Sequence, residues 1–212
     1  MDRQILDRCL AVLALLVLSP LLLLIGAAVV LDSGWPVFFG HNRVGCHGKL
    51  FRLLKFRTMR QGQAGPSITT SGDSRITRSG KFLRKFKLDE LPQFWNVVRG
   101  EMSLVGPRPE VPEFVDMNNP MWNSILKFRP GITDPASITY RNEELLLATS
   151  SDPIRFYEES VLPAKLALNL AYLRKRSLWL DLKVIGQTAQ CAIFPGDIPI
   201  KETGVFTRKD SE

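Results

Sequence analysis

The sequence predicts a mainly helical α+β protein with one apolar segment at its N-terminus that enters a membrane. Three observations predict this class. Residues 9–31 carry no charged side chain, two short runs rich in Val, Phe and Leu flank a glycine-containing turn, and apolar residues recur at helical spacing over much of the remaining chain. The 212 residues suffice for one globular domain and an accessory segment. We therefore expect a membrane helix at 1–34, one domain at 35–194 and a polar tail at 195–212.

The charge balance favours an anionic partner. The chain has 28 Lys and Arg against 21 Asp and Glu, a formal charge of +7, which suits nucleic acid, a phosphorylated substrate or an anionic membrane surface. Nucleic acid ranks last of the three, because no known binding motif is present and the cations gather near an apolar segment. The three cysteines are far apart and match no zinc spacing, so neither a disulfide framework nor a zinc site is expected.

The N-terminal run is long enough to cross a bilayer. Its 23 residues extend ~35 Å as a helix, against a hydrocarbon core of ~30 Å. A cleaved signal peptide fits less well, because the apolar part of a signal spans about 7–15 residues and no small-x-small cleavage site precedes Asp32. A buried core helix is the other alternative. Six Lys and Arg residues follow between residues 43 and 60, which places the rest of the chain in the cytoplasm.

Ser19 and Pro20 interrupt the middle of this run. Proline removes a backbone donor and breaks or kinks a helix, while a neighbouring serine hydroxyl can occupy the freed carbonyl. Each leg then covers about half of the bilayer core, which permits a helix that dips in and returns to the side it came from. An ordinary spanning helix with a proline kink fits as well, and the two arginines that precede the run are too few to decide.

A β-hairpin follows the membrane segment. Residues 36–43 and 49–57 form its two strands, and Gly45-Cys46-His47-Gly48 forms its turn. Residues 61–73 are rich in Gly, Ser, Thr and Gln and are predicted to be a loop, either a plain linker or a lid over a substrate.

The rest of the chain is predicted to be helical with short loops. Residues 75–101 have helical spacing but must divide at Pro92, which fits a first helical position. Residues 118–152 contain several prolines, which suggests loops and short helices. Helices return from Pro163 onward, and Trp179 beside the basic run 174–176 predicts an amphipathic helix at the membrane interface, although a core helix with a solvated basic face fits nearly as well.

Asp89 and Glu90 are the main candidates for chemistry. They lie near the helix junction marked by Pro92, and cations surround them in the sequence: Lys81, Arg84, Lys85, Lys87, Arg99 and Arg108. Carboxylates among cations suggest phosphate chemistry, because a divalent cation or Lys and Arg must offset the repulsion between carboxylate and phosphate. Adjacent helical side chains point ~100° apart, so one acid could attack phosphorus while the other holds a metal. A solvated surface pair balanced by Lys85 and Lys87 is the plain alternative.

Other chemistries find less support. His41 and His47 lack a third metal ligand and are more often surface residues in such a hairpin. Ser103 stands in no nucleophile motif, and neither a Walker loop nor a dinucleotide fingerprint is present.

Several motifs in this order resemble those of one family. The motifs are Ser19-Pro20, Pro36-Val37-Phe38-Phe39 with Arg43 and Gly45, Lys55-Phe56-Arg57-Thr58-Met59, Asp89-Glu90-Leu91-Pro92-Gln93, Ser103-Leu104-Val105-Gly106-Pro107-Arg108-Pro109, Arg129-Pro130-Gly131-Ile132-Thr133 and Arg141-Asn142. In this order they resemble the bacterial sugar transferases known as small monotopic phosphoglycosyl transferases. Residues 134–140 depart from a Trp-Ala-Gln-Val-like stretch of many relatives, so no sugar specificity is carried over.

The resemblance implies a function and roles for these residues. It implies transfer of a sugar phosphate from a nucleotide diphosphate sugar, usually a UDP sugar, to polyprenyl (undecaprenyl) phosphate, with UMP released and glycoconjugate assembly begun. Asp89 would be the nucleophile that carries a covalent phosphosugar, and Asp89 and Glu90 would organise Mg²⁺. The candidate phosphate-binding residues are Arg108, Arg141, Lys55 and Arg57.

The resemblance also implies a location. The helix would be re-entrant at Ser19-Pro20, and residues 35–194 would form a catalytic domain on the cytoplasmic face of the bacterial inner membrane, in contact with phospholipids. The competing hypothesis is a non-catalytic membrane adaptor whose basic surface binds anionic lipid, independently of Asp89 and Glu90.

Overall fold

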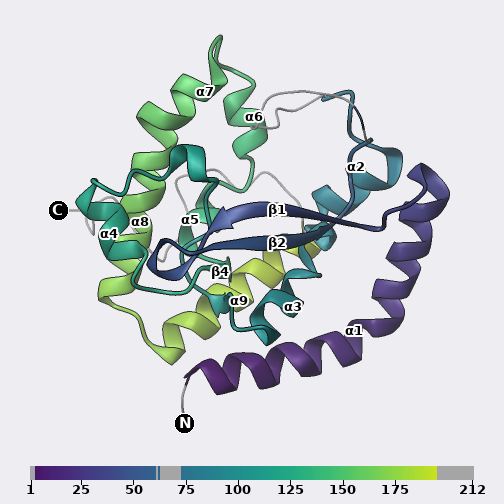
Figure 1. Ribbon diagram of the computed structural model, residues 1–212, viewed down its shortest axis with the longest axis horizontal. Coiled ribbons are helices and arrows are strands. Elements are labelled where there is room, and N and C mark those ends of the chain that lie inside the picture. Colours follow the sequence, from purple (N-terminus) through teal and green to yellow (C-terminus); the bar gives the residue numbers. More distant parts are fainter. Residues whose placement is uncertain (1–2, 61, 63–72, 195–212) are drawn as a thin grey trace.

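The computed structural model describes residues 3–60, 62 and 73–194 and confirms the mainly helical α+β class (Figure 1). In Figure 1 the central β-hairpin has α3, α9 and the first arm of α1 below it and α6 and α7 above it. The helices are α1 (Arg3–Ser33), α2 (Arg78–Lys85), α3 (Gln93–Val98), α4 (Pro120–Ile125), α5 (Pro135–Thr139), α6 (Glu143–Leu147), α7 (Pro153–Phe156), α8 (Leu162–Arg174) and α9 (Leu178–Ile193). The strands are β1 (Phe38–Val44), β2 (Leu50–Phe56), β3 (Ser103–Val105) and β4 (Gly131–Thr133). The predicted tail at 195–212 and nearly all of the predicted loop at 61–73 lie outside the described residues.

The predicted hairpin is confirmed. Strands β1 and β2 pair antiparallel from Phe38 opposite Phe56 to Val44 opposite Leu50. The turn between them contains a short 3₁₀ helix, Cys46–Gly48, in which His47 (φ 56°) and Gly48 (φ 74°) take the left-handed conformation that reverses the chain.

A second, parallel strand pair was not predicted. Strands β3 and β4 have three residues each, too few for a period-2 pattern to be visible in the sequence. Their ends touch so closely that a Cβ on Gly131 would lie 2.1 Å from the backbone nitrogen of Gly106. These two glycines therefore permit the close backbone approach that holds the residue 106–109 segment beside β4.

Helix α1 is bent at its middle rather than broken, which corrects the predicted break at Ser19-Pro20. The helix runs without interruption through Pro20, and Figure 1 shows it as two arms that meet at an angle. The Ser19 hydroxyl donates to the Leu16 carbonyl at 2.8 Å, and this is the carbonyl that Pro20, lacking an N–H, leaves open. The predicted rescue of the freed carbonyl by serine is thus confirmed, and it explains why the helix continues.

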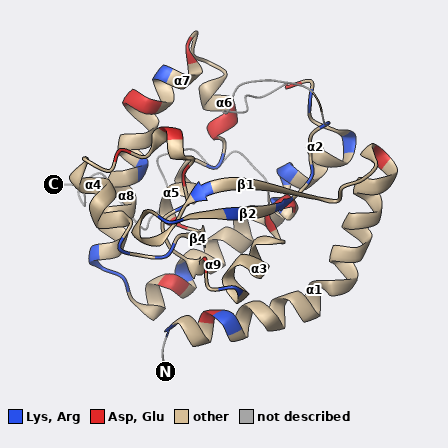
Figure 2. Cartoon of the chain, viewed as in Figure 1, with Lys and Arg blue, Asp and Glu red and all other residues tan. Residues whose placement is uncertain are grey.

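Both ends of α1 are fastened to the same domain. At its start, Arg3 Nη2 lies 2.5 Å from Asp181 Oδ2 on α9. At its end, Asp32 accepts hydrogen bonds from the backbone N–H and the hydroxyl of Ser79 on α2, each at 2.7 Å. Between these ends the helix is almost uncharged (Figure 2), and its most apolar stretch of 18 residues has a mean hydropathy of 2.8 and is only 11% buried. By length and composition α1 can cross a membrane, and it suggests membrane association.

The core is distributed over several clusters around the hairpin and α8. The largest contains Trp122 and Ile125 of α4 packed against Leu166 of α8. Helix α9 behaves differently, because its Leu178, Trp179 and Leu182 side chains are 58%, 78% and 60% exposed. Only Asp181, Val184 and Cys191 of α9 are buried. The alternative of a core helix therefore does not account for the exposed apolar side chains of α9.

Candidate active site

The acidic pair lies on a tight turn just before α3. A 3₁₀ turn, Leu88–Glu90, follows Lys87, whose φ of 56° is left-handed and reverses the chain after α2. Pro92 precedes the first residue of α3, so the predicted helix junction is confirmed. The turn directs the two side chains into different surroundings, and both are largely buried.

Glu90 is paired with two cations from distant parts of the chain. Its Oε1 lies 2.9 Å from Lys55 Nζ on β2, and its Oε2 lies 3.0 Å from Arg108 Nη1 after β3. A second bond from Arg108 Nη2 to Oε1 makes this pair bidentate. Burial by itself would raise the pKa of Glu90, but the charges of Arg108 and Lys55 outweigh it and hold that pKa well below its usual range. Glu90 is therefore ionised at neutral pH.

Asp89 has the opposite surroundings. The residue is 5% exposed, and its Oδ1 is buried without a hydrogen-bond partner among the described residues. Burial raises the pKa of Asp89, and the neighbouring Glu90 charge adds to the rise while Lys55 opposes it. A buried carboxylate oxygen without a hydrogen bond lowers the free energy of unfolding. A protein that keeps such a group is a candidate for having a functional site there.

The carboxylates fit a Mg²⁺ ion only in part. No group of three or more His, Cys, Asp or Glu side chains suited to a metal occurs in the described part of the chain. Mg²⁺ nevertheless often uses one or two protein carboxylates and takes its other ligands from substrate phosphates and water. The unpartnered Oδ1 of Asp89 suits such a site, whereas Glu90 would have to share oxygens that Lys55 and Arg108 already hold.

The structure does not bring Arg57 to the acidic pair. Its guanidinium is buried and donates to the carbonyls of Ser33 and Trp35, at 2.7 and 2.8 Å. These carbonyls lie at the end of α1 and just beyond it, where the helix leaves acceptors open. Arg57 therefore fastens the helix to the hairpin.

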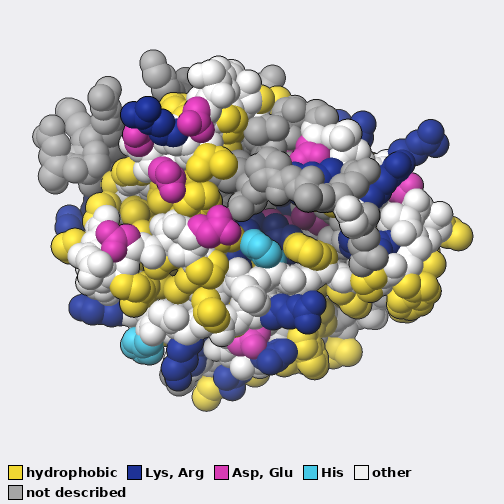
Figure 3. Space-filling model, turned by 45° about the horizontal axis from the view of Figure 1, so that its top comes forward, with side chains coloured by type: hydrophobic (Ala, Val, Ile, Leu, Met, Phe, Trp, Pro, Cys, Tyr) yellow, Lys and Arg dark blue, Asp and Glu magenta, His cyan; other side chains and the backbone are white. Residues whose placement is uncertain are grey.

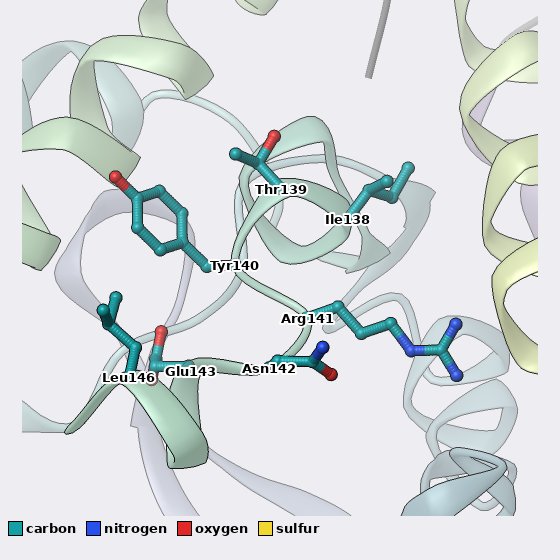
Figure 4. A pocket seen from close by; sticks show the side chains of 7 residues that line it. All are labelled: Ile138, Thr139, Tyr140, Arg141, Asn142, Glu143 and Leu146. Atoms are coloured by element: carbon teal, nitrogen blue, oxygen red, sulfur yellow. The ribbon is translucent and has the colours of Figure 1, made fainter. Parts of the chain in front are cut away.

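Arg141 also points elsewhere. Its guanidinium donates to the carbonyl of Cys191 on α9 and, at 3.4 Å, to that of Lys85 on α2. Figure 4 shows it extending away from Tyr140 and Leu146, which line a small cavity with it. That cavity holds about 20 Å³, room for about one water molecule, so it is no substrate pocket. Of the four predicted phosphate-binding residues, Lys55 and Arg108 are thus at the pair and Arg57 and Arg141 are not.

Two supporting residues were missed by sequence reasoning. Asn96 on α3 is fully buried, accepts from the Leu54 N–H at 3.0 Å and donates to the Arg52 carbonyl at 2.9 Å, which locks α3 onto β2. Glu110 accepts from Arg43 at 3.0 Å and from the Tyr157 hydroxyl at 2.6 Å, which holds the segment after Arg108 against β1. An acid directly after the Gly106–Pro109 motif was the only sequence signal for Glu110, and Asn96 had none.

Fold and site together define a membrane-associated domain with a buried carboxylate pair flanked by cations, an arrangement suited to phosphate chemistry. The chain belongs to the bacterial sugar transferase family, whose model matches residues 1–195. It is similar to a UDP-N-acetylgalactosamine-undecaprenyl-phosphate N-acetylgalactosaminephosphotransferase of Aeromonas hydrophila, with 38% identity over 86% of this chain and 41% of the relative. It is also similar to a UDP-glucose:undecaprenyl-phosphate glucose-1-phosphate transferase of Xanthomonas campestris, with 40% identity over 86% of this chain and 37% of the relative.

A third relative has a length closer to that of this chain. The exopolysaccharide production protein ExoY of Rhizobium meliloti is 35% identical over 89% of this chain and 84% of the relative. By contrast, the chain spans less than half the length of the Aeromonas and Xanthomonas proteins.

Proposed function

We propose that the protein transfers a sugar phosphate from a UDP sugar to undecaprenyl phosphate, releasing UMP and forming a polyprenyl-diphosphate-linked sugar. Family membership and the activities that the relatives are named for support the substrate classes. One observation carries the proposal for this chain: a buried Asp89 oxygen that has no partner among the described residues lies directly beside an ionised Glu90 bound by Lys55 and Arg108. Such an oxygen is available for a new bond at a place where cations can receive phosphate.

The reaction proceeds in two displacements at one phosphorus atom. The Asp89 carboxylate attacks the sugar-bearing phosphorus, the bond from that phosphorus to the bridging oxygen breaks, and UMP leaves with the electron pair. The sugar phosphate is then held on the Asp89 carboxylate as an acyl phosphate, a mixed anhydride. An oxygen of undecaprenyl phosphate attacks the same phosphorus, and the Asp89 carboxylate leaves unchanged. One phosphate site therefore serves the two substrates in turn.

Glu90, Lys55 and Arg108 prepare the site for these steps. The bidentate Arg108 pair fixes Glu90 in one orientation, and the cations offset the charge of incoming phosphates. Asp89 and Glu90 would also hold Mg²⁺, which when bound neutralises phosphate oxygens. Lys55 remains near enough to Asp89 to favour its ionised form.

Helix α1 enters the membrane as a re-entrant helix in this proposal. A spanning helix would carry Arg3 to the opposite face of the bilayer, yet Arg3 is bound to Asp181 and the other end of α1 is bound to Ser79, both in the same domain. The bend at the middle of α1, where its two arms meet at an angle (Figure 1), supports this topology. The exposed apolar side chains of α9 would lie in the interface, with the domain on the cytoplasmic face of the inner membrane.

Two measurements test the activity and the topology separately. Purified full-length protein with Mg²⁺, undecaprenyl phosphate and a panel of UDP sugars is expected to release UMP from at least one of them. Without the lipid, the intact protein is expected to gain the mass of one phosphosugar. An N-terminal epitope is expected to be cleaved by protease in inside-out vesicles and protected in spheroplasts. No UMP release from any UDP sugar would contradict the activity, and cleavage in spheroplasts would contradict the re-entrant helix.

A further inference from the structure

A hollow lies along the free edge of strand β1. Its volume is about 610 Å³, and it is lined by residues 39–42 of β1, Arg52 of β2 and residues 111–113. In the described part of the chain β1 pairs only with β2, so its other edge is open apart from Val44, whose N–H donates to the Glu110 carbonyl, and the turn Pro112–Phe114 runs beside it. On the face shown in Figure 3, a histidine lies at the centre, between hydrophobic and acidic side chains. The volume falls within the range of about 300–1,000 Å³ typical of small-molecule sites.

The hollow is lined by segments that lie next to residues of the catalytic cluster in the sheet or in the chain. Lys55 stands opposite Phe39 in the hairpin register, so the residue that binds Glu90 is a cross-strand neighbour of a residue that lines the hollow. The opposite wall, residues 111–113, follows Arg108 closely in the chain, and Arg108 binds Glu90. Two residues further on, the Glu110 carbonyl accepts from the Val44 N–H at 2.9 Å, which lays this segment along β1. A ligand with its phosphate at Asp89 can therefore extend into the hollow.

The side chains of the hollow suit an aromatic base. The rings of Phe39 and His41 are stacked, with centroids 6.0 Å apart and planes 19° from parallel, and Phe39 is 52% exposed. Burial lowers the pKa of His41, and the charges of Arg43 and Lys55 lower it further, so the imidazole is neutral at pH 7. Neutral flat rings stack on nucleobases irrespective of base identity.

The hollow also offers polar groups that the protein leaves available. Among the described residues, neither the imidazole of His41 nor the side-chain amide of Asn42 makes a hydrogen bond. The Arg52 side chain packs directly over Gly40 of β1. A Cβ at position 40 would lie 2.1 Å from Arg52 Nε, so only glycine leaves room for this guanidinium. A side-chain amide such as that of Asn42 can read the donor and acceptor edge of a base.

We propose that this hollow binds the nucleoside end of the UDP sugar, with Phe39 and His41 as the stacking surface and Asn42 as the contact to the base edge. This inference rests on the proposed function. The arrangement of the fold favours a nucleoside over the lipid. Starting at the hollow, the elements follow in the order β1, β2, α3 and the first arm of α1 (Figure 1). The hollow therefore opens on the side of the domain that faces away from this arm. A polyprenyl chain would approach from the α1 side.

The two histidines of the chain make a direct test possible. Full-length Asp89→Asn protein, which cannot turn over, is labelled with ¹³C and ¹⁵N only at histidine and titrated with UMP in nanodiscs. The His41 ring signals are expected to shift saturably, while those of His47, in the hairpin turn, stay in place. Farnesyl phosphate, a short polyprenyl phosphate, is expected to leave both unchanged. Shifts of His41 by farnesyl phosphate and not by UMP, or of neither histidine by UMP, would overturn the proposal.

Kinetics give a second readout that does not depend on labelling. The variants Phe39→Ala and His41→Ala are each expected to raise the KM for the UDP sugar and the inhibition constant of UMP by about tenfold, with a smaller effect on kcat. His47→Asn is the matched control, since asparagine tolerates the left-handed conformation there, and it is expected to change neither constant. Unchanged constants in both hollow variants, with UMP still released, would reject the nucleoside site and leave the proposed function standing. Absence of UMP release in the parent protein would instead reject the function.

Discussion

Two buried acid clusters in this protein differ in one respect. Asp181 on α9 has a partner for each carboxylate oxygen, since Oδ1 accepts from the Tyr172 hydroxyl and Oδ2 lies 2.5 Å from Arg3. Asp89 is as deeply buried, but its Oδ1 has no partner among the described residues. The protein itself therefore provides a partner for each oxygen of Asp181, whereas Asp89 keeps one oxygen without a partner among the described residues.

The difference distinguishes a carboxylate with a structural role from one with a proposed catalytic role. A buried carboxylate with all its hydrogen bonds made stabilises the contact in which it lies, here the fastening of α1 to α9. An unsatisfied buried group costs about 1–3 kcal/mol, and folding retains it only where the rest of the structure compensates. The following changes test whether the two clusters have these separate roles.

The largest effect is expected from Asp89→Asn. Loss of the proposed nucleophile should lower UMP release by at least ~10³-fold, because removal of a nucleophile abolishes the covalent route. The free energy of unfolding should not fall at pH 7 and is expected to rise, since a carboxylate whose pKa is raised by burial destabilises the folded state once it is ionised. Single-turnover UMP release and denaturant unfolding measure the two quantities. Near-normal activity would remove Asp89 from the mechanism.

The pH dependence of the wild-type protein should report the same group. The nucleophile must be ionised, and burial raises the pKa of Asp89 above its ordinary 3.8. The rate of the first step is therefore expected to fall as pH decreases through that raised pKa, by about tenfold per pH unit below it. Single-turnover rates of wild-type and Asp181→Asn protein should show the same midpoint. A midpoint at or below 3.8 would contradict the assignment.

Glu90→Gln should affect stability as well as activity. The change leaves Lys55 and Arg108 without their counterion, and a loss of about 2–3 kcal/mol is expected, between the values for exposed and fully buried pairs. The folded-state pKa of Glu90 is lowered, so its stabilisation is present above the unfolded value of 4.5 and is lost as pH falls through the folded value. The stability difference between wild type and variant should thus shrink in acid. Urea unfolding at pH 7 and pH 4 measures it, and a constant difference would show that the pairing is not its source.

Asp181→Asn should have the smallest effect on chemistry. It removes the charge that holds Arg3, so the start of α1 is expected to loosen by about 1–2 kcal/mol while the first-step rate changes less than about threefold. Limited proteolysis near the N-terminus measures the loosening. The matched control is Arg155→Ala, which breaks an exposed pair with Glu159 and should cost less than about 0.5 kcal/mol. A large loss of activity in Asp181→Asn would mean that the clusters are not separate.

Local signals accounted for much of the fold. The apolar run, the glycine turn of the hairpin and Pro92 each act through neighbouring residues, and the structure has α1, the β1–β2 hairpin and the helix junction where these signals place them. The β3–β4 pair escaped prediction because each strand has only three residues and pairs across more than twenty intervening residues. The sequence pointed to the acidic pair, which the structure buries beside Lys55 and Arg108 and whose catalytic role stays a prediction, whereas two of the four arginine and lysine candidates bind backbone carbonyls.

The amino-acid sequence by itself determined the elements and the acid-rich turn, because helix periodicity, turn glycines and proline act over a few residues. Only the tertiary structure decided which charges meet. Lys55, Glu90 and Arg108 come from a strand, a 3₁₀ turn and a loop, and packing of α3 on β2 and of the residue 108–113 segment on β1 brings them together. The same packing buries Asp89 beside them and leaves one oxygen open. Burial raises the pKa of Asp89, whereas Arg108 and Lys55 hold the pKa of Glu90 down against burial. Both effects exist only in the folded chain.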